Sequence, residues 1–524
     1  MRKATPLALT LLALFLLLPA RAALASDHQL SIMMDDNELV YRTDQVRDQA
    51  LTRMKQLGVD EVRVTLLWSV VADGARSTKA RDRRFRKLGA DNPKAYPVRN
   101  WDRYDRLARA CKTLGIQLYF DITGPGPSWG MTRPPRSQRR SAATWMPKAG
   151  QFAQFVKAVG KRFSGSYKDE NDRHQLIPRV STWALWNEPN QGGWLTPQWQ
   201  HGQPVSAMLF RRLYIAGRRA LVQTGHGKDT ILLGETAPLG GSKHTTRSPV
   251  APKQFIRALF CVDSANRPLR GGAARTLGCG DFDKYGPLLA SAYAHHPYTK
   301  KTPPTQPEPN PNDVTMANLG DLGTLLDGIA SATGRVSPGL PLISTEYGYE
   351  TNPPDPFAGI PLATQAQWDM QGDWLTFSNP RVIGNTQFLL YDVPPLTRFR
   401  KGSKAYWHTY QSGLFFANHT PKPSAYAYVF PLLVTGQFPG DVAVWGQLRF
   451  QPNGAGGDAV QIQWRPADGS APYANVGAPI AVGNPFGYFT ATVPVPPGGG
   501  FVRAVYAGSD PSAANAASPE QPVG

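Results

Sequence analysis

Two carboxylates in the sequence stand in settings that suit chemistry on a sugar. Glu188 lies in the segment Trp-Asn-Glu-Pro-Asn and Glu346 in Ser-Thr-Glu-Tyr-Gly, and each segment ends a run rich in apolar residues. A pair of carboxyl groups can hydrolyse a glycosidic bond when one protonates the leaving oxygen and the other attacks the anomeric carbon. Either residue alone is equally compatible with a solvated loop carboxylate, whereas the pair together indicates this reaction.

The chain alternates strand-like and helix-like segments between residues 30 and 430, and this alternation would position the two carboxylates. Eight apolar, β-rich runs occur, at 30–36, 61–71, 116–125, 180–190, 229–238, 290–299, 341–351 and 382–392. Helical patterns separate them, and several of these end in Gly. Strand–helix repetition with eight units predicts an α/β fold, the (β/α)8 TIM barrel. A doubly wound open sheet is the alternative, which the lack of a Gly-rich fingerprint after the first run disfavours.

Polar or aromatic residues end nearly every run, and in a barrel such ends converge on the face that carries active sites. They are Asp35, Asp36, Trp68, Asp121, Glu188, Glu235, His296, Tyr298, Glu346, Gln387 and Tyr391. We therefore expect Trp68, Asp121 and Glu235 to bind substrate. For Glu235, a third carboxylate, a shift of the pKa of Glu188 and a plain solvated side chain are alternatives.

The segments around Glu188 and Glu346 resemble those of the retaining glycoside hydrolases of clan A, and they are most similar to family 39 and to family 5-like secreted glycosidases. The resemblance covers residues 30–430. In that clan the acid/base Glu ends the fourth strand in an Asn-Glu-Pro motif, and the nucleophile Glu ends the seventh. The resemblance thus implies that Glu188 is the acid/base and Glu346 the nucleophile.

The same resemblance implies roles in substrate binding. Asn187 would contact the sugar 2-OH, His296 the sugar, and Tyr298 the nucleophile. Many clan members carry a Trp on the eighth strand beneath the reacting sugar. Here Gln387 or Tyr391 would take its place.

These roles agree with the charges that the reaction requires. A nucleophile must stay ionised, and Arg63, which the resemblance places on it, would favour the anion of Glu346 together with the Tyr298 hydroxyl. A structural salt bridge is the alternative for Arg63. The acid/base must hold a proton, and three flanking tryptophans would raise the pKa of Glu188 by excluding water. They are Trp183, Trp186 and Trp194.

No cofactor is expected. His295 and His296 could suggest zinc, but adjacent residues on a strand point to opposite faces. No third ligand lies at metal spacing, so we expect no metal site.

Residues 1–25 have the features of a signal peptide. Arg2 and Lys3 precede an apolar run at 6–18, and Ala-Leu-Ala at 23–25 matches a cleavage site. The run is too short to span a bilayer comfortably, although an uncleaved anchor is the alternative. No later run approaches ~18 apolar residues, so we expect a secreted or periplasmic protein without a membrane span.

Export to an oxidising compartment permits disulfides. Cys261 and Cys279 flank an irregular Gly- and Arg-rich segment, and we expect them to pair. Cys111 lies in an amphipathic segment and is expected to be a buried free thiol.

The pattern changes after about residue 436, where short alternating strands are broken by Gly and Pro. This pattern predicts a small C-terminal β-sandwich. Trp445 and Trp464 within it suit a core as well as a sugar platform, and we favour packing over carbohydrate binding. The expected organisation is a signal peptide at 1–25, a catalytic barrel at 26–430, a β-sandwich at 431–510 and a disordered tail at 511–524.

The 524 residues carry a net charge of +19, concentrated in residues 75–140, which hold 17 Lys or Arg against five Asp. This segment contains the loops after the second and third runs, so we expect an acidic glycan or a glycan in an anionic envelope, with a plain solvated surface as the alternative. No nucleic-acid partner is expected, because no recognition motif accompanies the charge. The predicted protein is a monomeric glycosidase that acts on a poly- or oligosaccharide; its rival is a barrel that binds glycans without cleaving them.

Overall fold

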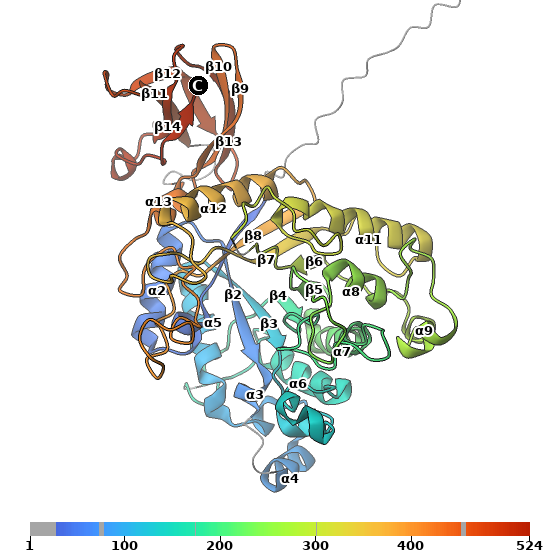
Figure 1. The fold of residues 1–524 in the computed structure, drawn as a ribbon. Helices are drawn as coiled ribbons and strands as arrows, with labels where there is room; N and C mark the ends of the chain where they lie inside the picture. Colours follow the sequence, from blue (N-terminus) through green and yellow to red (C-terminus); the bar gives the residue numbers. More distant parts are fainter. Residues whose placement is uncertain (1–27, 73–77, 173, 300, 452–456) are drawn as a thin grey trace, which may run out of the picture.

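The computed structural model describes the whole chain except residues 1–27, 73–77, 173, 300 and 452–456 (Figure 1). The predicted signal peptide lies outside the described residues. Within the described ranges, no helix combines the length and the apolarity that crossing a membrane requires.

Eight parallel strands form a closed barrel in chain order, which confirms the (β/α)8 fold. They are β1 (Leu30–Met34), β2 (Glu61–Leu67), β3 (Gln117–Thr123), β4 (Thr182–Leu185), β5 (Thr230–Thr236), β6 (Ala292–His295), β7 (Leu342–Tyr347) and β8 (Val382–Phe388). Each lies within one of the eight predicted runs. Side chains alternate along a strand, so one set fills the barrel interior, as Ile32, Leu232 and Ile343 do, while the other packs on helices.

Helices surround the barrel and bury their apolar faces against it (Figure 1). The helices are α1 (Asp36–Val40), α2 (Asp44–Gln56), α3 (Trp68–Val71), α4 (Thr78–Leu88), α5 (Asp102–Leu114), α6 (Ala149–Arg162), α7 (Ser206–Leu221), α8 (Pro252–Leu259), α9 (Gly271–Thr276), α10 (Asp281–Tyr285), α11 (Gly320–Thr333), α12 (Leu362–Phe377) and α13 (Pro423–Val429). Helix α5 ends at Gly115, whose φ of 64° is left-handed and thus favours glycine.

The C-terminal strands form two antiparallel sheets, which confirms the sandwich. One sheet contains β13 (Tyr488–Pro494), β10 (Asp441–Gln447) and β9 (Leu432–Phe438); the other contains β12 (Ala474–Val482), β11 (Asp458–Pro466), β14 (Gly500–Tyr506) and β15 (Gln521–Val523). The expectation of a disordered tail at 511–524 is wrong. β15 pairs with β14 and buries Val523, because its backbone completes an otherwise open sheet edge.

The sandwich packs beside α12 and α13, at the end of the barrel where the strands begin (Figure 1). Arg449 donates to Ser31 at the start of β1 and pairs with Asp373 of α12 at 2.8 Å. Trp445 is fully buried against Phe377, so it is a core residue. This contact lies opposite the face on which catalytic groups of such barrels gather.

The cysteines follow the prediction. Cys261 and Cys279 form a disulfide that closes the segment containing α9. Cys111 is a free, buried thiol on α5. Burial raises the pKa of this thiol to about 12, so it is inert at neutral pH.

Candidate active site

A cavity of about 970 Å³ opens where the barrel strands end. Both predicted catalytic residues line it, as do Asn187, Tyr298 and Phe388. Its wall also includes loops after β1, β5, β7 and β8. The residues that these loops contribute include Asp35, Asp36, Asn37, Pro238, Glu350, Phe357, Lys404 and Tyr410.

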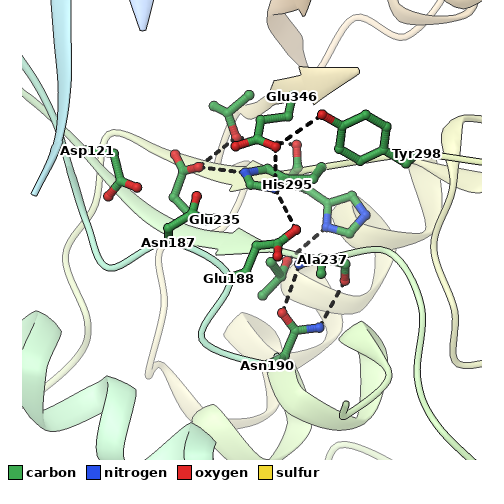
Figure 2. A network of polar contacts seen from close by, with 12 residues as sticks. Asp121, Asn187, Glu188, Asn190, Glu235, Ala237, His295, Tyr298 and Glu346 are labelled. Atoms are coloured by element: carbon green, nitrogen blue, oxygen red, sulfur yellow. Dashed lines mark hydrogen bonds and ion pairs between the residues drawn. The ribbon is translucent and has the colours of Figure 1, made fainter. Parts of the chain in front are cut away.

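Glu188 and Glu346 face each other in this cavity (Figure 2). One carboxylate oxygen of each lies within 4.8 Å of the other. Their side chains are 21% and 11% exposed, so both reach the cavity from largely buried positions. Trp186 and Glu188 after β4 have φ values of 84° and 38°, a left-handed backbone that non-glycine residues rarely adopt and that concentrates at functional sites.

Glu346 is held by the two groups that were predicted to hold it. Arg63 Nη1 donates to Glu346 Oε1 over 2.8 Å, and the Tyr298 hydroxyl donates to Oε2 over 3.1 Å. Burial and the charge of Glu346 keep the pKa of Tyr298 well above its usual range, so this hydroxyl remains a donor. Arg63 Nη2 also donates to Asn187 Oδ1 over 2.8 Å.

His296 and Glu235 lie beneath the cavity and do not line it, which corrects their predicted contact with substrate. His296 is fully buried, with Nε2 at 2.8 Å from Glu235 and Nδ1 at 3.1 Å from Glu188. Glu235 is 1% exposed and also accepts from Arg63. The polar atoms of both residues are already engaged, those of His296 by two carboxylates and those of Glu235 by Arg63, His296 and Tyr119.

Asp121 and Trp68 are also misassigned as substrate contacts. Asp121 is fully buried, with Oδ2 at 3.4 Å from Arg63 Nη2, and burial raises its pKa well above its usual range. Trp68 is fully buried in the helix layer, where it stacks on Phe155. It follows the last residue of β2 and begins α3, so its side chain turns outward.

On β8 the alternation of side chains decides which residue faces the cavity. Gln387 points outward and donates to the Ser412 carbonyl, while its neighbour Phe388 lines the cavity. Tyr391 stacks on His419, outside the cavity lining. The prediction that Gln387 or Tyr391 replaces the strand-eight Trp is therefore wrong, and Phe388 occupies the equivalent face.

The three tryptophans near Glu188 in the sequence differ in where their side chains lie. Trp194 lines the cavity, but Trp183 and Trp186 are fully buried behind the barrel wall, where Trp186 packs on Phe152. Trp194 alone is thus placed to keep water from Glu188.

Adjacent His295 and His296 point to opposite faces, as predicted. His295 bonds to Thr236 and to the Val314 carbonyl in the helix layer, and burial lowers its pKa to about 3. Atoms of Glu188, His296 and Glu346 lie within 4.8 Å of one another, close enough to surround a cation. His296 Nδ1 would have to surrender its hydrogen bond to Glu188 to bind one, so the group is better suited to handling protons.

A second hollow of about 220 Å³ adjoins the cavity, and sequence reasoning did not foresee it. The two share Glu350, Phe357, Ala358, Lys404 and Tyr410 and therefore lie side by side. Phe357 and Tyr410 are 43% and 57% exposed. The loops that carry them show no periodic pattern, so only the abundance of aromatic residues hinted at such a platform.

No protein-family model matches the chain, and neither does any curated protein sequence. Among solved structures, it is similar in fold to a GH5_18 protein from Streptomyces cattleya in complex with GlcNAc, with 15% identity over 76% of this chain and 78% of that chain and a TM-score of 0.45. A family 1 β-glucosidase from Thermotoga maritima shares 11% identity over 72% and 84%, with a TM-score of 0.43. A GH5_18 protein from Bifidobacterium longum shares 13% over 76% and 78%, with a TM-score of 0.43.

Proposed function

We propose that this protein is a retaining glycoside hydrolase that cleaves O-glycosidic bonds by double displacement. The observation that supports the proposal is the pairing of Glu188 and Glu346 across the cavity, with oxygens within 4.8 Å. Retaining enzymes hold their two carboxyl groups about 5–5.5 Å apart, whereas inverting enzymes need about 6.5–9.5 Å to admit a water between them. Arg63 and Tyr298 distinguish the two carboxylates, because both donate to Glu346.

In the first step Glu188 gives its proton to the glycosidic oxygen as the bond from that oxygen to the anomeric carbon breaks. Glu346 attacks the same carbon through one carboxylate oxygen and forms a glycosyl ester. Arg63 and Tyr298 keep this carboxylate aimed and ionised beforehand. Asn187 lines the cavity beside Glu188 and offers its amide nitrogen to the sugar 2-OH, since its oxygen already accepts from Arg63.

In the second step a water molecule takes the place of the leaving group. Glu188, now a carboxylate, accepts a proton from this water while the water oxygen attacks the anomeric carbon. The ester bond breaks, and Glu346 leaves as a carboxylate. Two inversions give overall retention, and Glu188 regains the proton that it lost.

The shape of the site supports a substrate longer than a single sugar. The hollow of about 220 Å³ lies beside the cavity of about 970 Å³, and exposed Phe357 and Tyr410 line both. Flat aromatic rings offer apolar faces to sugar rings. We therefore assign a poly- or oligosaccharide to this cavity, with carbohydrate as the partner.

Acidic groups on that glycan would meet cations outside the catalytic cavity. Among the described residues of the lining, Lys404 is the only Lys or Arg. Arg133, Arg136, Arg139 and Arg140 are exposed on the loop after β3. These residues support an anionic glycan or envelope as the target. The protein would reach that target after export, directed by the signal peptide proposed for residues 1–25.

Screening the purified protein against aryl glycosides and polysaccharides tests the proposal. Glu346→Gln should abolish turnover of every substrate, because an amide cannot form the ester. Proton NMR of the first product formed should show the anomeric configuration of the substrate. Inverted product would refute the retaining mechanism. Glycan binding by the wild type without turnover across the panel would favour the rival, a barrel that binds without cleaving.

A further inference from the structure

Glu235 is a buried carboxylate to which the double displacement gives no task. It is the penultimate residue of β5, has a φ of 54° and does not line the cavity. Arg63 Nη2 and His296 Nε2 each approach Oε2 at 2.8 Å, Thr345 Oγ1 donates to the same oxygen over 3.1 Å, and the Tyr119 hydroxyl donates to Oε1. Burial alone would raise the pKa of Glu235, but Arg63 and His296 outweigh burial and lower it. Glu235 is thus an anion.

His296 meets carboxylates at both of its nitrogens. Nε2 faces Glu235, and Nδ1 lies 3.1 Å from Glu188 Oε1 and 3.5 Å from Glu346 Oε2. A neutral imidazole has one nitrogen without a hydrogen, and its lone pair would here face an ionised carboxylate, that of Glu235 at Nε2 or that of Glu346 at Nδ1. The geometry therefore favours the imidazolium, which donates from both nitrogens.

Charged and titratable groups face His296 from every neighbouring strand. They are Arg63 on β2 through Glu235, Asp121 on β3, Glu188 after β4, Glu235 on β5, His295 on β6, Tyr298 after β6 and Glu346 on β7. Burial alone would lower the pKa of His296, but Glu346, Glu188 and Glu235 raise it to about 10. Because the shift is upward, the imidazolium is present at neutral pH and is lost as the pH rises through about 10.

We propose that Glu235 is a positioning residue that holds His296 as an imidazolium, so that one N–H, at Nδ1, serves both reacting carboxylates in turn. The proposal rests on the glycosidase function given above. In the free enzyme Nδ1 lies between the carboxyl groups of Glu188 and Glu346. Once Glu346 is esterified it carries no charge, and the N–H is left to Glu188, which at that stage is the anionic base. Through His296, Glu235 thereby acts on whichever of the two reacting carboxylates is charged, without touching the sugar.

NMR of the full-length protein labelled with ¹⁵N-histidine tests this arrangement directly, since ring-nitrogen shifts separate imidazolium from neutral imidazole. Loss of one signal in His296→Asn assigns the residue. The wild type should show His296 charged at pH 7 and up to about pH 10. In Glu235→Gln, which keeps the shape and removes the charge, the midpoint should fall by about one pH unit or more.

A second His–carboxylate pair supplies the matched control. His226 Nδ1 lies 2.6 Å from Asp229, remote from the cavity, and Asp229→Asn should leave the titration of His296 unchanged. Kinetics of Glu235→Gln should show kcat reduced roughly tenfold or more with KM within about twofold, because Glu235 does not line the cavity.

Two results would overturn the proposal: a neutral His296 in the wild type at pH 7, which requires no variant, or an unchanged midpoint in Glu235→Gln. The NMR readout is independent of turnover. Protein that titrates as expected yet cleaves no glycoside would refute the proposed function and leave the Glu235–His296 relationship standing. Retaining turnover with an unchanged midpoint would do the reverse.

Discussion

Arg63 donates to Glu346 from Nη1 and to Asn187 from Nη2, each over 2.8 Å. One planar guanidinium therefore fixes the carboxylate of β7 relative to the amide that follows β4. Lysine, with a single ammonium, cannot span both acceptors. We expect Arg63→Lys to lower kcat about 100-fold, as loss of a preorganised donor does, when measured on an aryl glycoside. Arg106→Lys, on the exposed face of α5, is the control and should keep wild-type kcat. Equal activity of the two variants would contradict this role.

The activity of the Glu188→Ala variant should depend strongly on the leaving group of the substrate. Without the acid, activated aryl glycosides should lose the least activity, because their leaving groups need little protonation. Added azide, which needs no base, should restore the rate and yield a glycosyl azide that retains the configuration of the substrate. NMR should be used to compare the anomeric configuration of this azide with that of the azide formed by Glu346→Ala. If the Glu188 variant gave the inverted azide, the two roles would be exchanged.

The disulfide between Cys261 and Cys279 closes a loop with a sequence separation of 18 residues. On chain-entropy grounds its removal should lower the free energy of unfolding by ~3 kcal/mol at most. The double Cys→Ser variant should therefore show a reduced Tm in the absence of reductant. Cys111→Ser provides the comparison, since this thiol is unpaired. Non-reducing peptide maps that found both Cys261 and Cys279 as free thiols would refute the pairing.

The aromatic platform shared by the two hollows should matter only for long substrates. Phe357→Ala should reduce kcat/KM on an oligosaccharide by about tenfold, as loss of a ring contact of about 1.4 kcal/mol does, and leave kcat/KM on a simple aryl glycoside within about twofold. Tyr426→Ala removes a ring that is 61% exposed on α13, outside both hollows, and should change neither. Equal losses on short and long substrates would argue against a platform.

The exposed arginines after β3 predict a dependence on salt. If the natural glycan or its envelope is anionic, kcat/KM should fall between ~0.01 and ~0.5 M ionic strength, over which screening of exposed charges changes strongly. Replacing Arg136, Arg139 and Arg140 together with Gln should flatten this dependence. A neutral aryl glycoside serves as the internal comparison. Constant kcat/KM on the natural substrate would exclude electrostatic attraction.

The sequence predicted the barrel and its two central carboxylates because both depend on local pattern. Each strand corresponds to an apolar run in the sequence, and Glu188 and Glu346 lie at the ends of two such runs. The pattern failed where one residue of register decides the outcome, as with Phe388 in place of Gln387. It also failed for Glu235. The sequence around a carboxylate near the end of a strand does not reveal whether the side chain faces solvent or, as here, bonds to Arg63 and His296 across the barrel.

The sandwich meets the barrel through Trp445 on Phe377 and through Arg449, which reaches Ser31 and Asp373. Cutting the chain at residue 431 would uncover an apolar patch on α12 and strip Asp373 of its cation. The C-terminal unit is therefore not an interchangeable module that could be detached or grafted onto another barrel. Barrel and sandwich should instead unfold in a single cooperative transition, and any engineered form of the barrel must keep the sandwich.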